Sequence, residues 1–417
     1  MKSRARSYGL LAGAAVAIAF WAGPVAFAQV GQFNQEQRGH YLVDAGDCAA
    51  CHTAERGKPF AGGRPIETPF GTIYSPNITP DPETGIGAWT SDQFYRAMHE
   101  GVAADGTHLY PAFPYPWFTK VTREDVDAIR AYLRTLPAVK SRRPPSTLPW
   151  PLSESVSMAG WNEFFFKPGT FQPDKTKSGA WNRGAYLVQG LGHCGACHSP
   201  KNILGATQNG NRYQGGTLNH WFAPDLTGTP GGGLKDWSVD DIAQFLKTGH
   251  NKRTSAYGPM AEVVSVSTSK LTDSDLHDIA TYIKSLPGTS DKPTAQTPGK
   301  NVMDAGAAIY ADQCSACHQK GGEGVNGVFP ALKGDSVVQS KTPMTVVRLI
   351  LNGGHGAWTK SNPDAKSMPS FGWKLSDNQI ASVATFVRNS WGNSASVVTS
   401  GEVHDLRKKV EAATSAN

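Results

Sequence analysis

The chain has no cysteine outside one short pattern, and this absence excludes several classes of protein at once. All six cysteines belong to three copies of Cys-x-x-Cys-His, which are Cys48-Ala-Ala-Cys51-His52, Cys194-Gly-Ala-Cys197-His198 and Cys314-Ser-Ala-Cys317-His318. No thiol is left over for a structural disulfide, a separate zinc site or an isolated nucleophile. Every interpretation of the cysteines therefore concerns what this repeated pattern binds.

Long apolar runs and clusters of basic residues are also missing from most of the sequence. After residue 28 no stretch approaches the roughly 18 apolar residues of a membrane-spanning helix, so we expect any membrane attachment to be peripheral. The net charge of +6 includes three positive charges near the N-terminus, at Lys2, Arg4 and Arg6, which leaves +3 for the remainder. No basic run interleaved with aromatic residues occurs, and we expect no nucleic-acid partner.

The first 28 residues have the features of a secretory signal peptide. The basic start is followed by the apolar run Leu10–Phe20 and by the small-residue site Ala26-Phe27-Ala28. Glycine and proline near the exit of this run favour cleavage over an uncleaved anchor helix. We therefore expect an exported protein whose mature chain begins near Gln29.

The repeated cysteine pattern is typical of covalent haem c attachment. The two thiols add to the two vinyl groups of one porphyrin, and the adjacent histidine binds the iron. A single copy could also be a redox dithiol or half of a zinc site, but three copies that use every cysteine favour haem. The sequence predicts three covalent haem c groups, attached by Cys48, Cys51, Cys194, Cys197, Cys314 and Cys317, with His52, His198 and His318 as iron ligands.

A common helical plan surrounds each haem motif. An opening helix precedes the motif, and Arg38-Gly39-x-Tyr41-Leu42-Val43 in the first unit matches Arg183-Gly184-x-Tyr186-Leu187-Val188 in the second. The third unit keeps Gly306 and Tyr310 on one helical face. In class I cytochromes c the opening and closing helices cross, and the glycine permits a close approach at that crossing.

Each unit also ends with a predicted helix. These closing helices start at cap candidates Thr122, Thr272 and Ser376, each followed by acidic residues in the first turn. A further helix, introduced by Trp89-Thr90 and Trp237-Ser238 in the first two units, lies between the opening and closing helices. The sequence therefore predicts an all-α protein of three tandem domains, at 29–139, 179–289 and 301–394.

The segments between and after these domains differ in character. Residues 140–178 are rich in proline and aromatic residues, and we expect this linker to pack against something. Residues 290–300 have the composition of a short extended linker. Residues 395–417 are polar and charged and are expected to form a tail that is mobile at its end.

Two methionines are candidates for the sixth ligand of a haem iron. Electron-carrying haems commonly take a methionine opposite the histidine, and the thioether raises the reduction potential. Met260 follows Gly258-Pro259 in the second unit, and Met368 precedes Pro369 in the third. Both lie in the loop ahead of the closing helix, which favours a ligand role over ordinary core packing.

The first unit departs from this arrangement, because Phe113 stands where a methionine is expected. A phenyl ring cannot bind iron. Three possibilities follow: a five-coordinate haem, His108 as the sixth ligand, or Met98 reaching in from the middle helix. Met98 aligns with Leu246 and Ile350, which also fits a packing role, and the sequence does not decide between these possibilities.

A proline follows each haem motif, at Pro76, Pro224 and Pro330. In class I cytochromes the carbonyl of such a proline accepts a hydrogen bond from Nδ1 of the proximal histidine and fixes its ring. The alternative is an ordinary turn proline. His193, beside Cys194, is interpreted as a polar surface residue rather than a ligand.

Stretches such as "RGHYLVDAGDCAACHT" and "WNRGAYLVQGLGHCGACHSPKNILG" resemble the tri-haem cytochrome c subunit of bacterial membrane-bound dehydrogenases. The resemblance extends over the mature chain and implies a large catalytic partner, either a quinoprotein or a flavoprotein dehydrogenase. It also implies peripheral attachment at the periplasmic face of the cytoplasmic membrane and transfer of substrate electrons to ubiquinone. Many members have methionine where Phe113 stands, which puts only the first haem's ligation in doubt.

Two other functions fit parts of the sequence. A free periplasmic electron shuttle agrees with the haem motifs, but such a carrier needs only one small unit. A haem enzyme with an open first haem agrees with Phe113 alone, and the chain has neither a nucleotide-binding glycine motif nor a separate catalytic domain. We therefore expect an electron-transfer subunit that is not catalytic by itself.

Overall fold

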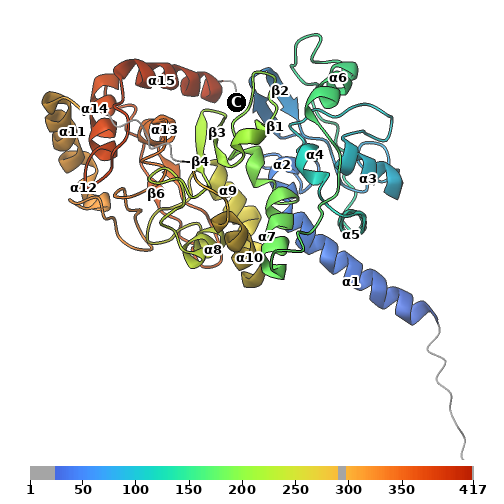
Figure 1. Ribbon diagram of the computed structural model, residues 1–417. Coiled ribbons are helices and arrows are strands. Elements are labelled where there is room, and N and C mark those ends of the chain that lie inside the picture. The colour runs from blue at the N-terminus through green and yellow to red at the C-terminus, as the bar shows by residue number, and fades with distance from the viewer. Residues whose placement is uncertain (1–23, 290–296, 416–417) are drawn as a thin grey trace, which may run out of the picture.

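The structure is a computed structural model that describes residues 24–289 and 297–415. It is mostly helical, and three units follow one another along the chain, from blue through green to red in Figure 1. Most of the predicted signal peptide and of the linker 290–300 lies outside the described residues. Within the described ranges, no helix combines the length and the apolar character needed to cross a membrane.

Unit one is built from five helices and one hairpin. Its elements are α1 (Pro24–Ala45), α2 (Cys48–His52), β1 (Pro65–Thr68), β2 (Gly71–Tyr74), α3 (Ser91–Glu100), α4 (Tyr115–Phe118) and α5 (Arg123–Leu133). The two strands pair in antiparallel register, with Ile66 opposite Ile73. The hairpin follows the first haem motif directly and leads into the segment that contains Pro76.

Unit two repeats this order with a different distal helix. Its elements are α7 (Gly179–Gln189), the 3-10 turn Cys194–Ala196, β3 (Gln214–Leu218), β4 (Trp221–Asp225), α8 (Val239–Thr248), α9 (Pro259–Val266) and α10 (Asp273–Lys284). Further 3-10 turns lie at Asn209–Asn211 and Thr268–Lys270. Strands β3 and β4 form an antiparallel hairpin.

Unit three has the same opening, middle and closing helices. Its elements are α11 (Lys300–Gln313), α12 (Ser315–His318), α13 (Met344–Asn352), β5 (Gly354–His355), β6 (Ser367–Met368) and α14 (Asp377–Arg388). The short strands β5 and β6 place Gly354 opposite Met368. The three small two-stranded sheets are the only strand pairs in the described residues, and the predicted helical class is confirmed.

The opening and closing helices cross at a glycine in every unit, as predicted. A Cβ atom at Gly39 would lie 1.9 Å from the carbonyl oxygen of Ala128 in α5. A Cβ atom at Gly184 would lie 1.9 Å from the backbone carbonyl oxygen of Asp278, and one at Gly306 would lie 2.3 Å from that of Ser382. Backbone contact this close leaves no room for any side chain, so each crossing requires glycine.

The predicted caps of the closing helices are also present. Thr122, Thr272 and Ser376 each accept a hydrogen bond from the backbone N–H three residues later. These bonds satisfy amide groups that have no partner inside the helix. The caps thereby fix where α5, α10 and α14 begin. In each unit, the segment just before this start contains the position where the sequence predicts or would lead us to expect a sixth ligand.

The aromatic-rich linker contains a helix that packs on unit one. Helix α6 (Ser155–Phe165) buries Met158, which is 5% exposed. Trp161 Nε1 donates to the carbonyl oxygen of Leu204 at 2.9 Å, and the Tyr115 hydroxyl donates to Asn162. The linker is therefore a folded arm that contacts both unit one and unit two.

The predicted polar tail is instead mostly a docked helix, which corrects our expectation. Helix α15 (Ser400–Ser415) buries Val403, Leu406 and Val410 against the core of unit three. Arg407 Nε donates to Asp377 at 2.8 Å and ties the helix to the start of α14. The three apolar residues recur at helical spacing among charged ones, so the abundance of charge concealed an amphipathic helix.

Three clusters of buried apolar residues lie in the described part of the chain, two large and one small. Units one and two share one core, in which Leu42 and Ile129 of unit one join Leu187 and Ile283 of unit two. Unit three has a separate core around Ile380. The small cluster packs Ala357 of unit three against Ala256, Ala261 and Val264 of unit two. The first two units therefore share their main core, whereas unit three has its own and meets unit two through a small apolar contact.

Candidate functional site

The three motif histidines have the same hydrogen bond. His52 Nδ1 lies 2.8 Å from the Pro76 carbonyl oxygen, His198 Nδ1 lies 2.7 Å from that of Pro224, and His318 Nδ1 lies 3.0 Å from that of Pro330. A carbonyl oxygen can only accept, so Nδ1 must carry the proton in each ring. The predicted histidine–proline bonds are confirmed, and they leave the Nε2 lone pair free to bind a metal.

Burial controls the ionisation of the motif side chains. It lowers the pKa of His52, His198 and His318 below the usual value, which favours the neutral imidazole that binds a metal. It raises the pKa of the Cys48 and Cys194 thiols to about 12. Thiols that stay protonated are poor redox nucleophiles, which argues against a dithiol–disulfide role for the motifs.

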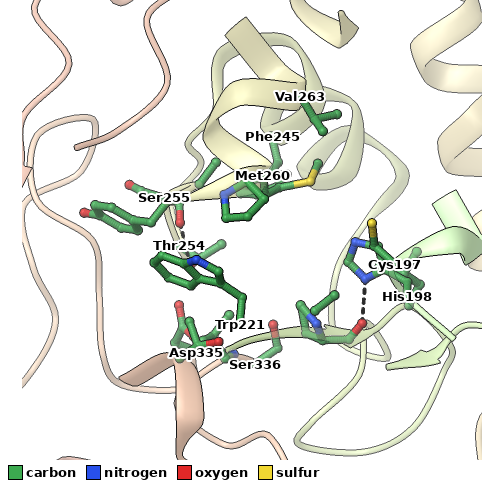
Figure 2. A pocket seen from close by; sticks show the side chains of 18 of the residues that line it. Cys197, His198, Trp221, Phe245, Thr254, Ser255, Met260, Val263, Asp335 and Ser336 are labelled. Carbon is green, nitrogen blue, oxygen red and sulfur yellow. Dashed lines mark hydrogen bonds between the residues drawn. The ribbon is translucent and has the colours of Figure 1, made fainter. Parts of the chain in front are cut away.

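The sites of units two and three open into one cavity. Its walls include Cys194, Cys197, His198 and Met260 from unit two together with Cys314, His318 and Met368 from unit three. Figure 2 shows the Met260 side chain extending toward the side of the cavity where Cys197 and His198 lie. The structure thus brings together, around a mainly apolar space, the two predicted methionines and most motif residues of units two and three. Cys317 and the first motif's Cys48, Cys51 and His52 are not among the lining residues.

Two different local structures position the methionines. Met260 lies in the first turn of α9, directly after Gly258, whose φ of 55° is favoured by glycine. A Cβ at Gly258 would lie 2.6 Å from the Trp221 ring, so the glycine also admits that tryptophan. Met368 lies in β6, where it is held by pairing with Gly354.

In unit one, Phe113 and the two candidate ligands His108 and Met98 lie in different surroundings. Phe113 packs its ring 5.4 Å from that of Phe118 and belongs to the wall of the shared core. His108 Nδ1 lies 3.4 Å from Asn162 Nδ2 in α6, and its backbone N–H donates to Ser155 at 2.6 Å. Met98 is buried in α3 with 6% exposure.

Three parts of the cavity wall were not anticipated from the sequence. Thr254 of unit two and Asp335 of unit three meet where the two units adjoin, and Trp221 lies beside them (Figure 2). Asp335 Oδ1 accepts the backbone N–H groups of Val337 and Val338 at 2.7 and 2.9 Å. Burial raises the pKa of this carboxyl above its usual value. No short motif marks such residues, because their neighbours come from another repeat.

Unit one also reaches the cavity. Ala45 and Asp47, which immediately precede the first haem motif, are among the lining residues. Burial raises the pKa of the Asp47 carboxyl to about 8. His193, which was expected at the surface, also lines the cavity and stacks on Phe118 with ring centres 5.4 Å apart. The surface interpretation of His193 was wrong, because unit one covers it.

Arg64 links the first motif to the helix that carries Met260. Its guanidinium donates to both carboxylate oxygens of Glu262 in α9 and to the carbonyl oxygen of Ala50, which lies between Cys48 and Cys51. The Arg64 Nη2 to Glu262 Oε2 distance is 2.8 Å. The first haem motif and the predicted ligand loop of unit two are therefore held next to each other.

Comparison with known proteins agrees with this geometry. The sequence profile of the cytochrome c family matches residues 36–137, 182–287 and 303–391, once in each unit. The gluconate 2-dehydrogenase cytochrome c subunit of Pantoea cypripedii is 41% identical over 393 residues, which cover 89% of each chain. The cytochrome c subunit of the alcohol dehydrogenase (quinone) of Gluconacetobacter polyoxogenes is 42% identical over 393 residues, covering 89% of this chain and 84% of that one.

A third relative is the fructose dehydrogenase cytochrome subunit of Gluconobacter japonicus, 37% identical over 403 residues, which cover 89% of this chain and 82% of that one. Three cytochrome c domains, each with its Cys-x-x-Cys-His motif, carry three covalent haem c groups. The histidines with a free Nε2 and the apolar cavity fit that group. The chain thus belongs to the family of three-domain cytochrome c subunits of bacterial membrane-bound dehydrogenases.

Proposed function

We propose that the chain is the electron-transfer subunit of a periplasm-facing dehydrogenase complex, and that it carries electrons from a catalytic subunit to ubiquinone. The observation that supports this most directly is the cavity that joins the three units. Its wall combines the motif residues of units two and three with Ala45 and Asp47 of unit one. The motifs of units two and three share this wall, and the motif of unit one begins directly after Asp47, so the three sites are neighbours in one molecule and need no separate mobile carrier between them.

Each type of site residue has its own role in this proposal. The six cysteines attach the porphyrins, while His52, His198 and His318 bind iron through Nε2. Met260 and Met368 would supply the sixth ligands in units two and three, since both line the same cavity as His198 and His318. Bound haem c supplies one-electron redox chemistry, and a thioether ligand raises its potential. The apolar wall excludes water and so favours the less charged, reduced state.

The partners follow from the same proposal. The relatives are named as subunits of gluconate, alcohol and fructose dehydrogenases, so we infer a large catalytic subunit that contains a quinone or flavin cofactor. We infer peripheral attachment at the periplasmic face of the membrane. The arm formed by α6 supports a docking role, since Trp150 and Phe164 are 80% and 81% exposed.

The test is reconstitution with the proposed catalytic subunit. Purified, substrate-reduced catalytic subunit should reduce all haems of the oxidised cytochrome within one turnover, and a soluble ubiquinone analogue should reoxidise them. A His318→Ala variant with its third haem site disabled should slow quinone reduction strongly. If the catalytic subunit reduces quinone equally fast without the cytochrome, the proposed function is wrong.

A further inference from the structure

Unit one lacks a ligand at the position that supplies one in unit two. Phe113 occupies the loop position of Met260, and its ring packs 5.4 Å from Phe118 and 6.5 Å from Tyr115. A phenyl ring has no lone pair to donate to iron. Any sixth ligand for the haem bound at His52 must therefore come from another element of unit one.

The middle helices of units one and two have the same length and the same caps, so their positions can be aligned one by one. Helices α3 and α8 are both 10 residues long, and both start with a reciprocal capping box, at Thr90 and Ser238. Both end at a glycine with positive φ, Gly101 at 69° and Gly249 at 77°. The caps leave no freedom of register, and Met98 is therefore equivalent to Leu246.

The equivalent positions in the other units face the haem space. In α8 the cavity wall includes Ile242, Phe245 and Leu246, and in α13 it includes Val346, Leu349 and Ile350. These positions share one helical face, seven, four and three residues before the glycine that ends each helix, Gly249 and Gly353. In α3 the same positions hold Phe94, Ala97 and Met98, and Phe94 and Met98 are each 6% exposed. Met98 therefore lies on the face of α3 that corresponds to the haem-facing side of α8 and α13.

The substitution next to Met98 provides space on the same face. Ala97 stands where units two and three have the large side chains of Phe245 and Leu349. A methionine has three side-chain torsions and needs room to turn its sulfur toward an iron atom. The small residue in α3 provides that room, which the other two units do not need because their methionines come from α9 and β6 rather than from the middle helix.

The competing ligand is held elsewhere. The His108 ring lies against Asn162 of α6, and its backbone is fixed by Ser155 and by an isolated bridge to Val102. These contacts place it under the linker arm. Met158, the other buried methionine near unit one, belongs to that arm itself.

We propose that Met98 is the sixth ligand of the haem in unit one. This inference rests on the proposed haem binding at His52 and extends it. The thioether of α3 replaces the loop thioether lost at Phe113, so all three haems have histidine–methionine ligation although the first draws its methionine from a different element. Phe113 then forms part of the wall of the site, and its presence does not mean that the first haem has an open coordination position.

The test uses Met98→Leu, which installs the residue that unit two has at this position. Wild-type oxidised protein should show the methionine-to-iron charge-transfer band of three haems, and the variant should lose one third of its intensity. The reduced variant should bind one carbon monoxide per three haems, and wild type should bind none. Met158→Leu is the matched control and should change neither readout. Intact mass confirms that every variant still contains three haems.

A double variant separates ligation from packing. Met98→Leu combined with Phe113→Met places a methionine where unit two has Met260, and it should restore the lost third of the band. Carbon monoxide binding by the wild-type protein would overturn the proposal in favour of an open haem. An unchanged band in Met98→Leu would also overturn it, and a spectral change in His108→Ala would identify histidine as the ligand. These spectra are measured without the dehydrogenase. A negative result would therefore refute the Met98 ligand without refuting the proposed function.

Discussion

The contacts between units one and two differ in kind from those between units two and three. In the first pair, the Tyr186 hydroxyl of α7 donates to Asp125 of α5 at 2.6 Å, and the Tyr41 hydroxyl of α1 donates to Asp275 of α10 at 2.5 Å. Each carboxylate is also bound by an arginine of its own unit: Arg38 reaches Asp125 at 2.7 Å and Arg183 reaches Asp275 at 2.8 Å. The interface is therefore reciprocal, since each unit offers its tyrosine to the other unit's aspartate.

The second pair uses backbone and aromatic contacts. Thr345 of α13 accepts from Phe222 N–H at 2.9 Å and donates to the Phe222 carbonyl oxygen at 3.0 Å. The Arg348 guanidinium lies 4.4 Å from the centre of the Trp221 ring. Apolar packing between these two units is limited to a small cluster in which Ala357 meets Ala256, Ala261 and Val264, while their main cores are separate. The haem cavity itself is the main space that the two units share.

The difference is encoded at three positions of the repeat. Where units one and two have arginine, tyrosine and aspartate, unit three has Ala305, Ala308 and Gln379. The glycine crossing and the histidine–proline bond are the same in all three units. Haem binding and docking between units are therefore specified by separate sets of residues, so one can change without the other.

The largest effect is expected for Asp125→Ala. The carboxylate is 2% exposed, and its loss leaves the buried Tyr186 hydroxyl without an acceptor. Since Arg38 is half exposed and can be solvated, we expect a loss of about 2–3 kcal/mol in the free energy of unfolding of the first two units. Chemical denaturation followed by haem absorbance measures this loss.

Gln379→Ala in unit three is the matched control for this variant. Its side chain bonds only the capping residue Ser376, at 2.9 Å, and its loss should cost about 0.5–1 kcal/mol. Equal effects of the two variants would mean that the reciprocal interface contributes nothing beyond a helix cap.

A smaller effect is expected for Thr345→Val at the second interface. Valine keeps the shape but leaves the Phe222 backbone groups unpaired, which should cost about 1–2 kcal/mol. Hydrogen exchange in α13 should accelerate, while exchange in α5 should not. Thr217→Val at an exposed position of β3 is the control and should change stability by less than about 0.5 kcal/mol. Faster exchange in α5 would show that the two interfaces are not independent.

Acid should weaken the first interface before the second. Burial opposes ionisation of Asp275, but the hydrogen bonds from Arg183 and Tyr41 outweigh it and lower the pKa of this carboxyl. A lowered pKa contributes stability that is present above the unfolded value of about 4 and is lost as the pH falls through the folded value. Denaturation midpoints measured from pH 6 to pH 3 should fall less steeply in Asp275→Asn. An unchanged slope would contradict this assignment.

The smallest effect is expected for Glu262→Gln. Arg64 and Glu262 are 35% and 37% exposed, so solvent screens their ion pair. We expect a loss of a few tenths of a kcal/mol and a weak dependence on salt, measured by thermal unfolding at low and high ionic strength. A loss above about 1 kcal/mol would mean that this pair, rather than the reciprocal tyrosines, joins the first two units.

The features that could be predicted from the sequence have fixed offsets along the chain. The haem motifs, the caps such as Thr122, the crossing glycines such as Gly39 and the prolines such as Pro76 each act within one unit. The Tyr186–Asp125 bond joins residues 61 positions apart in different repeats, and no local pattern shows which side chains of two similar units will meet. The shared cavity was missed for the same reason.

Helix α15 was missed for a different reason. Its buried residues Val403, Leu406 and Val410 have helical spacing, but the charged residues around them dominate the composition. A periodicity test on the tail identifies this helix, whereas composition alone does not. The proposed Met98 ligand of the first haem could not be chosen from the sequence, because the argument for it needs both the register of α3 and the cavity walls of the other units.

The central claim is that each of the three units binds one haem c. Intact mass spectrometry of the mature protein tests it most directly. We predict the peptide mass plus three haems for the wild type and plus two haems for each of three variants, in which both cysteines of one motif are replaced by alanine. A wild-type mass with two or fewer haems would contradict the account, as would a variant that loses no haem when its motif is removed.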